Sequence, residues 1–136
     1  MMYAISLHQP WASFVAAEIK PYETRSWKPP VWLLGKRIAI HAAKKSVPAD
    51  DREWARRYGI DPIPLGAVVC TAILASVHRA DAVPADEFGD YAPGRFAWRL
   101  TEIELFDPPV PARGAQGFWK WRALGPSLGP LFAAGA

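Results

Sequence analysis

Three side chains that could carry chemistry lie close together in the sequence: Lys20, Glu23 and Arg25. On an extended segment Glu23 and Arg25 would point to the same side, because side chains alternate along a strand. Arginine offers a planar fork that suits phosphate oxygens or base edges, and a lysine with a lowered pKa can act as a general base. The trio therefore indicates a structural ion-pair network, a site for a polar, anionic ligand, or both together.

Aromatic and basic residues nearby extend this candidate site. Trp11 and Trp27 flank the trio, and each either belongs to the core or stacks on a nucleobase, a contact worth about 1–3 kcal/mol in single-strand binders. His41, Lys44 and Lys45 follow one another at the end of an expected strand. They could meet a phosphate, with His41 moving a proton near neutral pH, or they could be a half-buried histidine and two solvated lysines.

Hydrophobic periodicity predicts the elements that must position these residues. Residues 10–19 show helical spacing, and Pro21 is expected to end the helix. Residues 65–74 are continuously apolar and β-branched, which is typical of a central strand covered on both sides. A phase change within residues 96–105 predicts a bulge near residues 101–102. The other expected elements are strands at 3–7, 22–27, 36–42 and 118–121 and a helix at 48–58.

The composition excludes several classes of protein. With 136 residues, of which 51% are hydrophobic and 21% charged, the chain is typical of one globular domain. The single cysteine, Cys70, excludes an intrachain disulfide and a multi-cysteine zinc site, and no other metal or cofactor is expected. The first residues lack a signal-peptide pattern, and no run approaches the ~18 apolar residues of a membrane helix. A cytoplasmic protein without membrane contact is therefore expected.

Basic charge is concentrated in one part of the chain. Between residues 20 and 57, ten lysines and arginines stand against four acidic residues, a net charge of +6. The whole chain carries +3, so the remainder carries −3. This asymmetry fits a footprint for a phosphate backbone or another anion, and the alternative is a solvated surface of mixed charge.

Five segments between about Ile5 and Trp121 carry a family resemblance. They are SLHQPWA (6–12), KPYETRSW (20–27), IHAAKK (40–45), GRFAWRL (94–100) and QGFW (116–119). Together, and in this order, they resemble the ASCH domain. The resemblance implies an α+β fold, a PUA-like β-barrel of about six strands with two or three flanking helices. We expect one such domain over residues 1–122. The last residues are rich in glycine, alanine and proline, which predicts a flexible C-terminal tail at 123–136.

The hallmark pattern of that family is G-x-K-x-x-E-x-R. Lys20, Glu23 and Arg25 match it, whereas Glu18 stands at the glycine position and implies an ordinary helical conformation there. The PUA-like superfamily, to which that family belongs, is largely associated with binding RNA or modified bases. The resemblance therefore implies an RNA- or modified-nucleotide-binding domain with a basic cleft around this motif.

Some relatives of the family hydrolyse N4-acylated cytidines with the motif lysine, a threonine and a distal glutamate. Lys20 matches the lysine, but Glu23 stands at the threonine position beside Thr24, and residues 66–74 contain no acid for the distal role. Ribonuclease activity has also been assigned within the family. The alternative hypothesis is therefore an N4-acylcytidine amidohydrolase or a ribonuclease with Lys20 and Glu23 as catalytic residues. A third hypothesis, suggested by the abundant aromatic residues, is an accessory protein with a protein partner.

Overall fold

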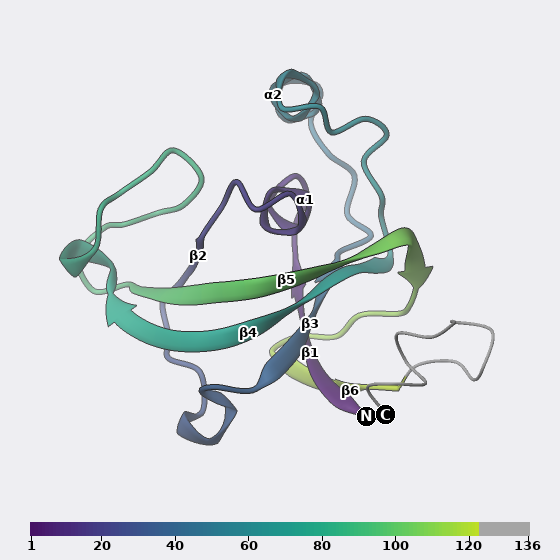
Figure 1. Cartoon of the computed structure of the whole chain (residues 1–136). Coiled ribbons are helices and arrows are strands. Elements are labelled where there is room, and N and C mark those ends of the chain that lie inside the picture. The colour runs from purple at the N-terminus through teal and green to yellow at the C-terminus, as the bar shows by residue number, and fades with distance from the viewer. Residues whose placement is uncertain (123–136) are drawn as a thin grey trace.

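Two long antiparallel strands, β4 (Ala67–Arg79) and β5 (Phe96–Pro111), form the centre of the fold in a computed structural model that describes residues 1–122. β4 runs beyond the predicted strand 65–74, because its second half also pairs with β5. Its first six residues are all buried, as the continuous apolar pattern predicts. The two strands curve across the molecule and carry the remaining elements (Figure 1).

Four shorter strands complete one sheet in the order β2-β5-β4-β3-β1-β6. β1 and β3 run parallel, and the other neighbouring pairs are antiparallel. The sheet curls like a barrel but stays open, with β2 and β6 at its two edges (Figure 1). The predicted α+β class and the number of strands are confirmed. The shorter strands are β1 (Met2–Leu7), β2 (Tyr22–Arg25), β3 (Arg37–Ala42) and β6 (Phe118–Trp121).

A bulge in β5 lets residues of opposite phase reach the same core. Thr71 pairs with Glu104 and Ile73 pairs with Thr101, so two residues of β5 lie opposite one residue of β4. Glu102 has a φ of 50°, and its carbonyl oxygen accepts a hydrogen bond from Arg37 Nη1 at 2.9 Å. The predicted bulge near residues 101–102 is therefore confirmed.

Two helices and two short 3-10 turns flank the sheet. α1 packs Ala12 and Val15 into the main core. Its Phe14 packs instead into an aromatic cluster with Trp54 of α2 and Phe88, at ring-centroid distances of 4.8 and 5.0 Å. This cluster attaches α2 on the outer side of α1 (Figure 1). The elements are α1 (Trp11–Ala16), η1 (Val31–Leu33), α2 (Ala49–Arg57) and η2 (Ala80–Ala82).

The helix α1 ends earlier than predicted, at Ala16 rather than just before Pro21. The backbone N–H groups of Ile19 and Lys20 both donate to the carbonyl oxygen of Phe14, at 2.9 and 3.1 Å. Glu18 has a φ of 61°, in the left-handed region that lets the chain turn away from the helix. The predicted ordinary helical conformation of Glu18 is therefore wrong, because this residue adopts the kind of backbone that glycine adopts most easily.

Replacing Glu18 with glycine should stabilise the protein by about 0.5–1 kcal/mol. The left-handed conformation costs an L-residue about 1–2 kcal/mol, and the greater freedom of glycine in the unfolded chain offsets about 0.5–1 kcal/mol of that. Glu18→Ala is the matched control, because alanine keeps the Cβ and should bring no such gain. Urea denaturation of the three proteins measures the difference, and equal stability of the glycine and alanine variants would contradict this account.

No helix within residues 1–122 is long and apolar enough to cross a membrane. The predicted C-terminal tail at residues 123–136 lies outside the described residues. Cys70 is buried in the main core, where burial raises the pKa of its thiol to about 12. Its thiol therefore stays protonated at neutral pH.

Candidate functional site

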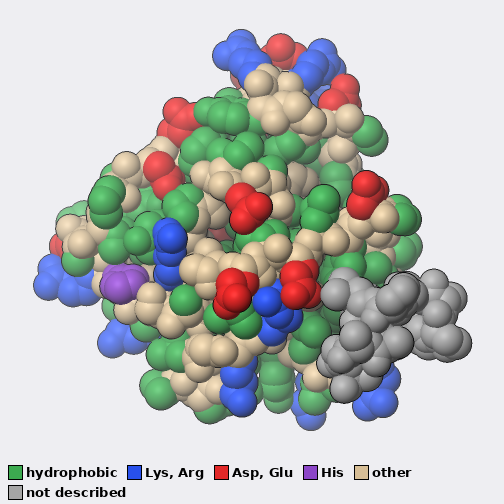
Figure 2. Space-filling view, in the orientation of Figure 1, with side chains coloured by type: hydrophobic (Ala, Val, Ile, Leu, Met, Phe, Trp, Pro, Cys, Tyr) green, Lys and Arg blue, Asp and Glu red, His purple; other side chains and the backbone are tan. Residues whose placement is uncertain are grey.

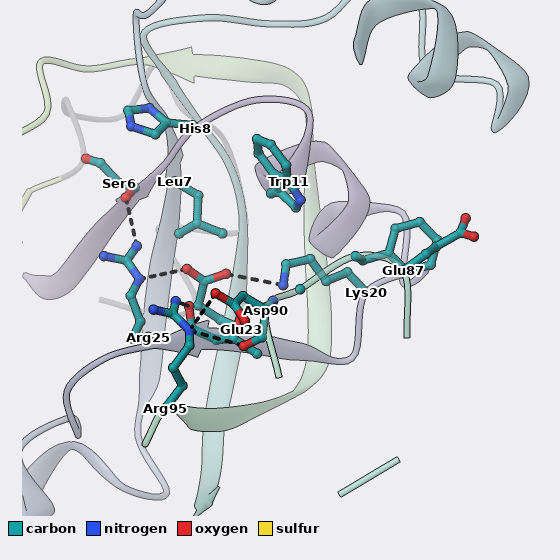
Figure 3. A pocket seen from close by; sticks show the side chains of 13 residues that line it. Ser6, Leu7, His8, Trp11, Lys20, Glu23, Arg25, Glu87, Asp90 and Arg95 are labelled. Atoms are coloured by element: carbon teal, nitrogen blue, oxygen red, sulfur yellow. Dashed lines mark hydrogen bonds and ion pairs between the residues drawn. The ribbon is translucent and has the colours of Figure 1, made fainter. Parts of the chain in front are cut away.

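The three charged residues of the motif meet as one ion-pair network (Figure 3). Alternation along β2 places Glu23 and Arg25 on the same face, and Lys20 reaches them from the turn after α1. Glu23 Oε2 lies 2.7 Å from Arg25 Nε, and Glu23 Oε1 lies 3.4 Å from Lys20 Nζ. The structural ion-pair interpretation of the trio is therefore confirmed, and it leaves both cations oriented by one carboxylate.

Lys20 forms the floor of this network. The residue is 2% exposed, and its Nζ donates a hydrogen bond to the carbonyl oxygen of Tyr22 at 2.5 Å. Burial lowers the pKa of Lys20 below its ordinary value, while the nearby charge of Glu23 acts in the opposite direction. Lys20 therefore acts on the pocket mainly through its positive charge and its lowered pKa, because almost none of its surface is accessible to a ligand.

Arg25 is the more accessible cation of the trio, with 23% of its side chain exposed. Its Nη2 donates to the carbonyl oxygen of Ser6 at 3.1 Å, and its Nε is bound to Glu23. Its guanidinium carbon lies 5.9 Å from the ring centroids of both Trp27 and Trp98. Within residues 1–122 its Nη1 has no hydrogen-bond partner, so this group is free to donate to a ligand.

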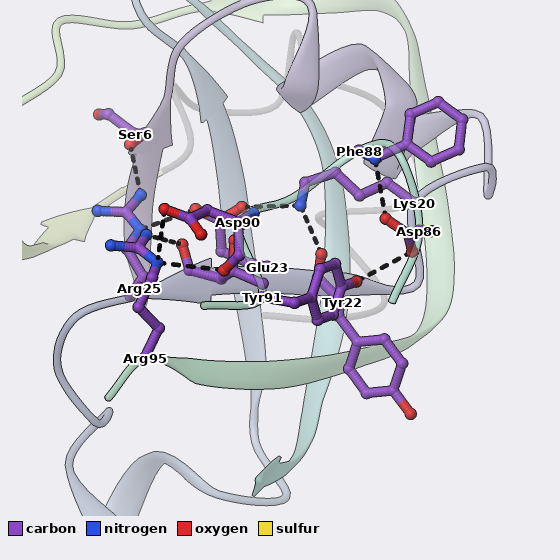
Figure 4. Close-up of polar contacts among 11 residues, drawn as sticks. Ser6, Lys20, Tyr22, Glu23, Arg25, Asp86, Phe88, Asp90, Tyr91 and Arg95 are labelled. Carbon is purple, nitrogen blue, oxygen red and sulfur yellow. Dashed lines mark hydrogen bonds and ion pairs between the residues drawn. The ribbon is translucent and has the colours of Figure 1, made fainter. Parts of the chain in front are cut away.

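The loop between β4 and β5 closes the other side of the network (Figure 4). Arg95 Nε donates to the carbonyl oxygen of Asp90 at 3.1 Å, and Arg95 Nη2 donates to the carbonyl oxygen of Thr24 at 3.2 Å. In return, the Asp90 N–H donates to Thr24 Oγ1 at 3.0 Å. Asp86 accepts a hydrogen bond from Tyr91 Oη at 2.9 Å. These contacts fix the loop against β2.

The motif residues and this loop line a pocket of about 490 Å³, the first pocket. Three basic and three acidic residues line it, so it offers both hydrogen-bond donors and acceptors. Of the three carboxylates, that of Glu87 points away from the others (Figure 3) and accepts a hydrogen bond from Tyr58 Oη at 2.5 Å. Trp11, at the start of α1, lies half-buried in its wall (Figure 3). Within residues 1–122, it is the only one of the seven tryptophans whose ring does not pack against another aromatic ring. The lining residues are Ser6, Leu7, His8, Trp11, Lys20, Glu23, Thr24, Arg25, Glu87, Phe88, Gly89, Asp90 and Arg95.

The remaining predicted contacts are not in the first pocket. Trp27, His41 and Lys44 line a second pocket of about 1290 Å³, which shares Arg25 and two other residues with the first. Lys45 is exposed and lines neither pocket. The residues predicted to line one cleft are therefore divided between two adjoining pockets. The second is lined by Ser6, His8, Arg25, Trp27, His41, Ala43, Lys44, Gly66, Pro111, Ala112, Arg113, Gly114, Ala115, Gln116 and Gly117.

The two tryptophans that flank the motif have different surroundings. Trp27 packs edge-to-face on Trp98 at 4.9 Å and on Phe118 at 5.9 Å between ring centroids, so most of its ring serves the core. Trp11 has no such aromatic neighbour within the described part of the chain. Trp11 is therefore the better of the two for stacking on a ligand.

His41 is a buried link between three segments, with 2% of the residue exposed. Its Nε2–H donates to the carbonyl oxygen of Ala112 at 2.7 Å, because a carbonyl oxygen can only accept. Its Nδ1 then accepts from Ser6 Oγ at 2.9 Å, and that hydroxyl also accepts from Trp119 Nε1 at 3.1 Å. Burial lowers the pKa of His41, which favours this neutral form. His41 thus holds the segment after β5 against β1.

The sequence patterns indicate no role for Glu87, Asp90 or Arg95, nor for Ser6 or His8. Residues 79–93 show no hydrophobic period, so they indicated only a connection. One local signal points to this loop: acidic residues stand at positions 86, 87 and 90, and their charge is opposite to that of the two cations of the motif. This complementarity could have predicted that the loop lies near the motif.

On one face of the molecule, the charged side chains are divided into separate groups (Figure 2). On the face shown in Figure 2, lysine and arginine side chains occur at several places with acidic side chains between them. The basic excess of residues 20–57 therefore forms no continuous basic surface on this face. Within residues 1–122, no group of three or more histidine, cysteine or acidic side chains could hold a metal ion.

Comparison with known proteins relates this arrangement to one family. The sequence model of the ASCH domain matches residues 5–109. The chain resembles the crystal structure of ASCH from Zymomonas mobilis, with 18% identity and a TM-score of 0.58 over 89% of this chain and 87% of that chain. The chain also resembles two mutant structures of the Zymomonas mobilis protein. The first mutant has 16% identity and a TM-score of 0.58 over 89% of this chain and 90% of that chain. The second mutant has 18% identity and a TM-score of 0.57 over 89% of this chain and 88% of that chain. At these identities the likeness shows the fold alone. No curated protein sequence matches the chain.

Proposed function

Because this chain belongs to the ASCH domain family, we propose that it binds single-stranded RNA, placing one base or modified base in the first pocket. The observation that carries the proposal is the combination of a tryptophan that has no aromatic neighbour in residues 1–122 and a mixed set of donors and acceptors around about 490 Å³. Pockets of a few hundred cubic ångströms are typical for small ligands. An unstacked nucleotide is such a ligand.

The pocket chemistry suits a base better than a bare anion. The edge of a base carries donors and acceptors side by side, and single-stranded RNA exposes these edges while its base faces stack on aromatic side chains. Arg25 Nη1 is available as a donor, and the carboxylate of Asp90, whose side chain is 63% exposed, lines the pocket as an acceptor. Trp11 supplies the stacking surface. A phosphate alone would instead meet cations that are already paired with the carboxylates of Glu23 and Asp90.

Trp11→Ala should weaken binding of a labelled single-stranded RNA by about 5- to 150-fold, as expected for about 1–3 kcal/mol of stacking. Fluorescence anisotropy measures the affinity. Trp32→Ala is the matched control, since Trp32 is an exposed tryptophan that lines neither pocket. Equal affinities of the two variants, or RNA binding that neither substitution affects, would refute the placement of a base on Trp11.

A hydrolase is the second candidate, and the position of Lys20 is the observation that favours it. Burial lowers the pKa of this lysine, as a general base requires, and carboxylates from a distant loop line the same pocket. Asp90, which lies 3.5 Å from Arg95 Nε through its Oδ2, is the candidate for the distal acid that the sequence left open, since the Glu87 carboxylate is bound to Tyr58 Oη. The activity would act on an N4-acylated cytidine or on RNA itself.

Incubation of the protein with N4-acetylcytidine and with labelled RNA separates the two candidates. Turnover that Lys20→Met abolishes, in a variant whose circular dichroism spectrum matches that of the wild type, would establish the hydrolase. Lys20→Met is preferable to alanine because it fills the buried space of the lysine stem. Binding without turnover of either substrate leaves the RNA-binding function.

A further inference from the structure

We infer that the second pocket binds the phosphate of a neighbouring nucleotide, so that the ligand is a single-stranded RNA segment that spans both pockets and not an isolated nucleoside. This inference rests on the proposed function, because it needs a base in the first pocket. The two pockets adjoin, since Ser6, His8 and Arg25 line both of them. A chain leaving the first pocket would pass over Arg25 and enter the second.

The two pockets differ in the sign of their charge. The first has Lys20, Arg25 and Arg95 balanced by Glu23, Glu87 and Asp90. The second has Arg25, Lys44 and Arg113 and contains no acidic side chain among its described lining residues. An anion would therefore be attracted to the second pocket, whereas the first suits a neutral polar group.

Two of the three cations of the second pocket, Lys44 and Arg113, are also free to pair with a ligand. Within residues 1–122, neither Lys44 nor Arg113 forms an ion pair or a hydrogen bond through its side chain. In contrast, Lys20, Arg25 and Arg95 of the first pocket are each held by a carboxylate. Both free cations are exposed, so a phosphate that neutralises them need not displace a protein partner.

The backbone around these two cations is closely packed. The stem of Lys44 lies along Gly66, where an added Cβ would be 3.8–3.9 Å from three carbons of the lysine. Beside Arg113, a Cβ added at Gly114 would lie 2.6 Å from His41 Cε1 and 2.7 Å from Ser6 Oγ. The hydrogen bond from His41 to the carbonyl oxygen of Ala112 ties the same segment down. The segment is thus a fixed wall that presents Arg113 at the pocket.

The test uses the full chain and a labelled single-stranded RNA of about eight nucleotides, within the range that one such domain covers. Lys44→Ala/Arg113→Ala should lower the affinity about tenfold at low salt. It should also reduce the slope of log K against log salt concentration by about 1.4, which corresponds to two phosphate contacts. Lys36→Ala/Arg52→Ala is the matched control. It removes one exposed lysine and one exposed arginine, both without side-chain partners in residues 1–122 and both outside the two pockets.

Failure of the inference can be distinguished from failure of the proposed function. Trp11→Ala should lower the affinity without changing the salt slope, because a stacking contact neutralises no phosphate. If Trp11→Ala weakens binding but the two double variants behave alike, the base site stands and the phosphate site is refuted. If the wild-type protein binds no single-stranded RNA, both are refuted.

Discussion

Replacing Glu23 with alanine should destabilise the folded protein by about 3–5 kcal/mol, as expected when one partner of a buried ion pair is removed. Both of its carboxylate oxygens are engaged, one with Lys20 and one with Arg25. The ammonium of Lys20 is almost fully buried, so without the carboxylate it would remain beside a second cation with no counter-ion in contact. Urea denaturation at neutral pH measures the loss.

Glu23→Gln separates the charge from the shape of this side chain. Glutamine can still accept from Arg25 Nε, but it removes the main influence that raises the pKa of Lys20. Burial then keeps the folded-state pKa of Lys20 below that of the unfolded chain, so between these two values the unfolded chain binds more protons. Stability should therefore rise with pH in that window, and the deficit of Glu23→Gln should shrink from neutral pH to about pH 10.

Adding Lys20→Met to Glu23→Gln provides the control for this account. The double variant carries no buried ammonium, so it should be more stable than Glu23→Gln alone, although the carbonyl oxygen of Tyr22 loses its donor. A deficit that does not change with pH, or a double variant less stable than either single variant, would show that Glu23 is not the counter-ion of Lys20.

Local patterns were sufficient for the part of the site that lies on one strand. The alternation of residues 22–27 predicted that Glu23 and Arg25 share a face, and β2 confirms it. The phase change in residues 96–105 likewise predicted the bulge at Glu102. In both cases the period of the side chains along a strand fixes their direction, so no knowledge of distant residues is needed.

Contacts between distant segments could not be predicted in this way. Asp90 and Arg95 reach Thr24 across about 70 positions of sequence, and nothing local marks that approach. For the same reason, His41 and Lys44 were grouped with the motif although they line a separate pocket. The conformation of Glu18 was missed for another reason: the turn required by the hydrogen bonds to Phe14 overrides the preference of the residue itself.

Acidification should destabilise the protein through His41, because this imidazole is neutral and buried in the folded state. Burial lowers its folded-state pKa, whereas in the unfolded chain the pKa is about 6.5. Above pH 6.5 both states are neutral at this group and its contribution is constant. Below that value the unfolded chain binds a proton that the folded protein does not, so stability falls by up to about 1.4 kcal/mol per pH unit until the folded pKa is reached.

His41→Gln tests this assignment, because glutamine can donate to Ala112 but cannot gain a proton. The variant should be less stable at neutral pH, since it cannot reproduce both bonds of the imidazole. Its stability should also fall less steeply than that of the wild type between about pH 6.5 and pH 5 in urea titrations. His8→Gln removes an exposed imidazole and serves as the control. If His41→Gln and the wild type lose stability in parallel over this range, the link from His41 through Ser6 and Ala112 is not what makes the fold sensitive to acid.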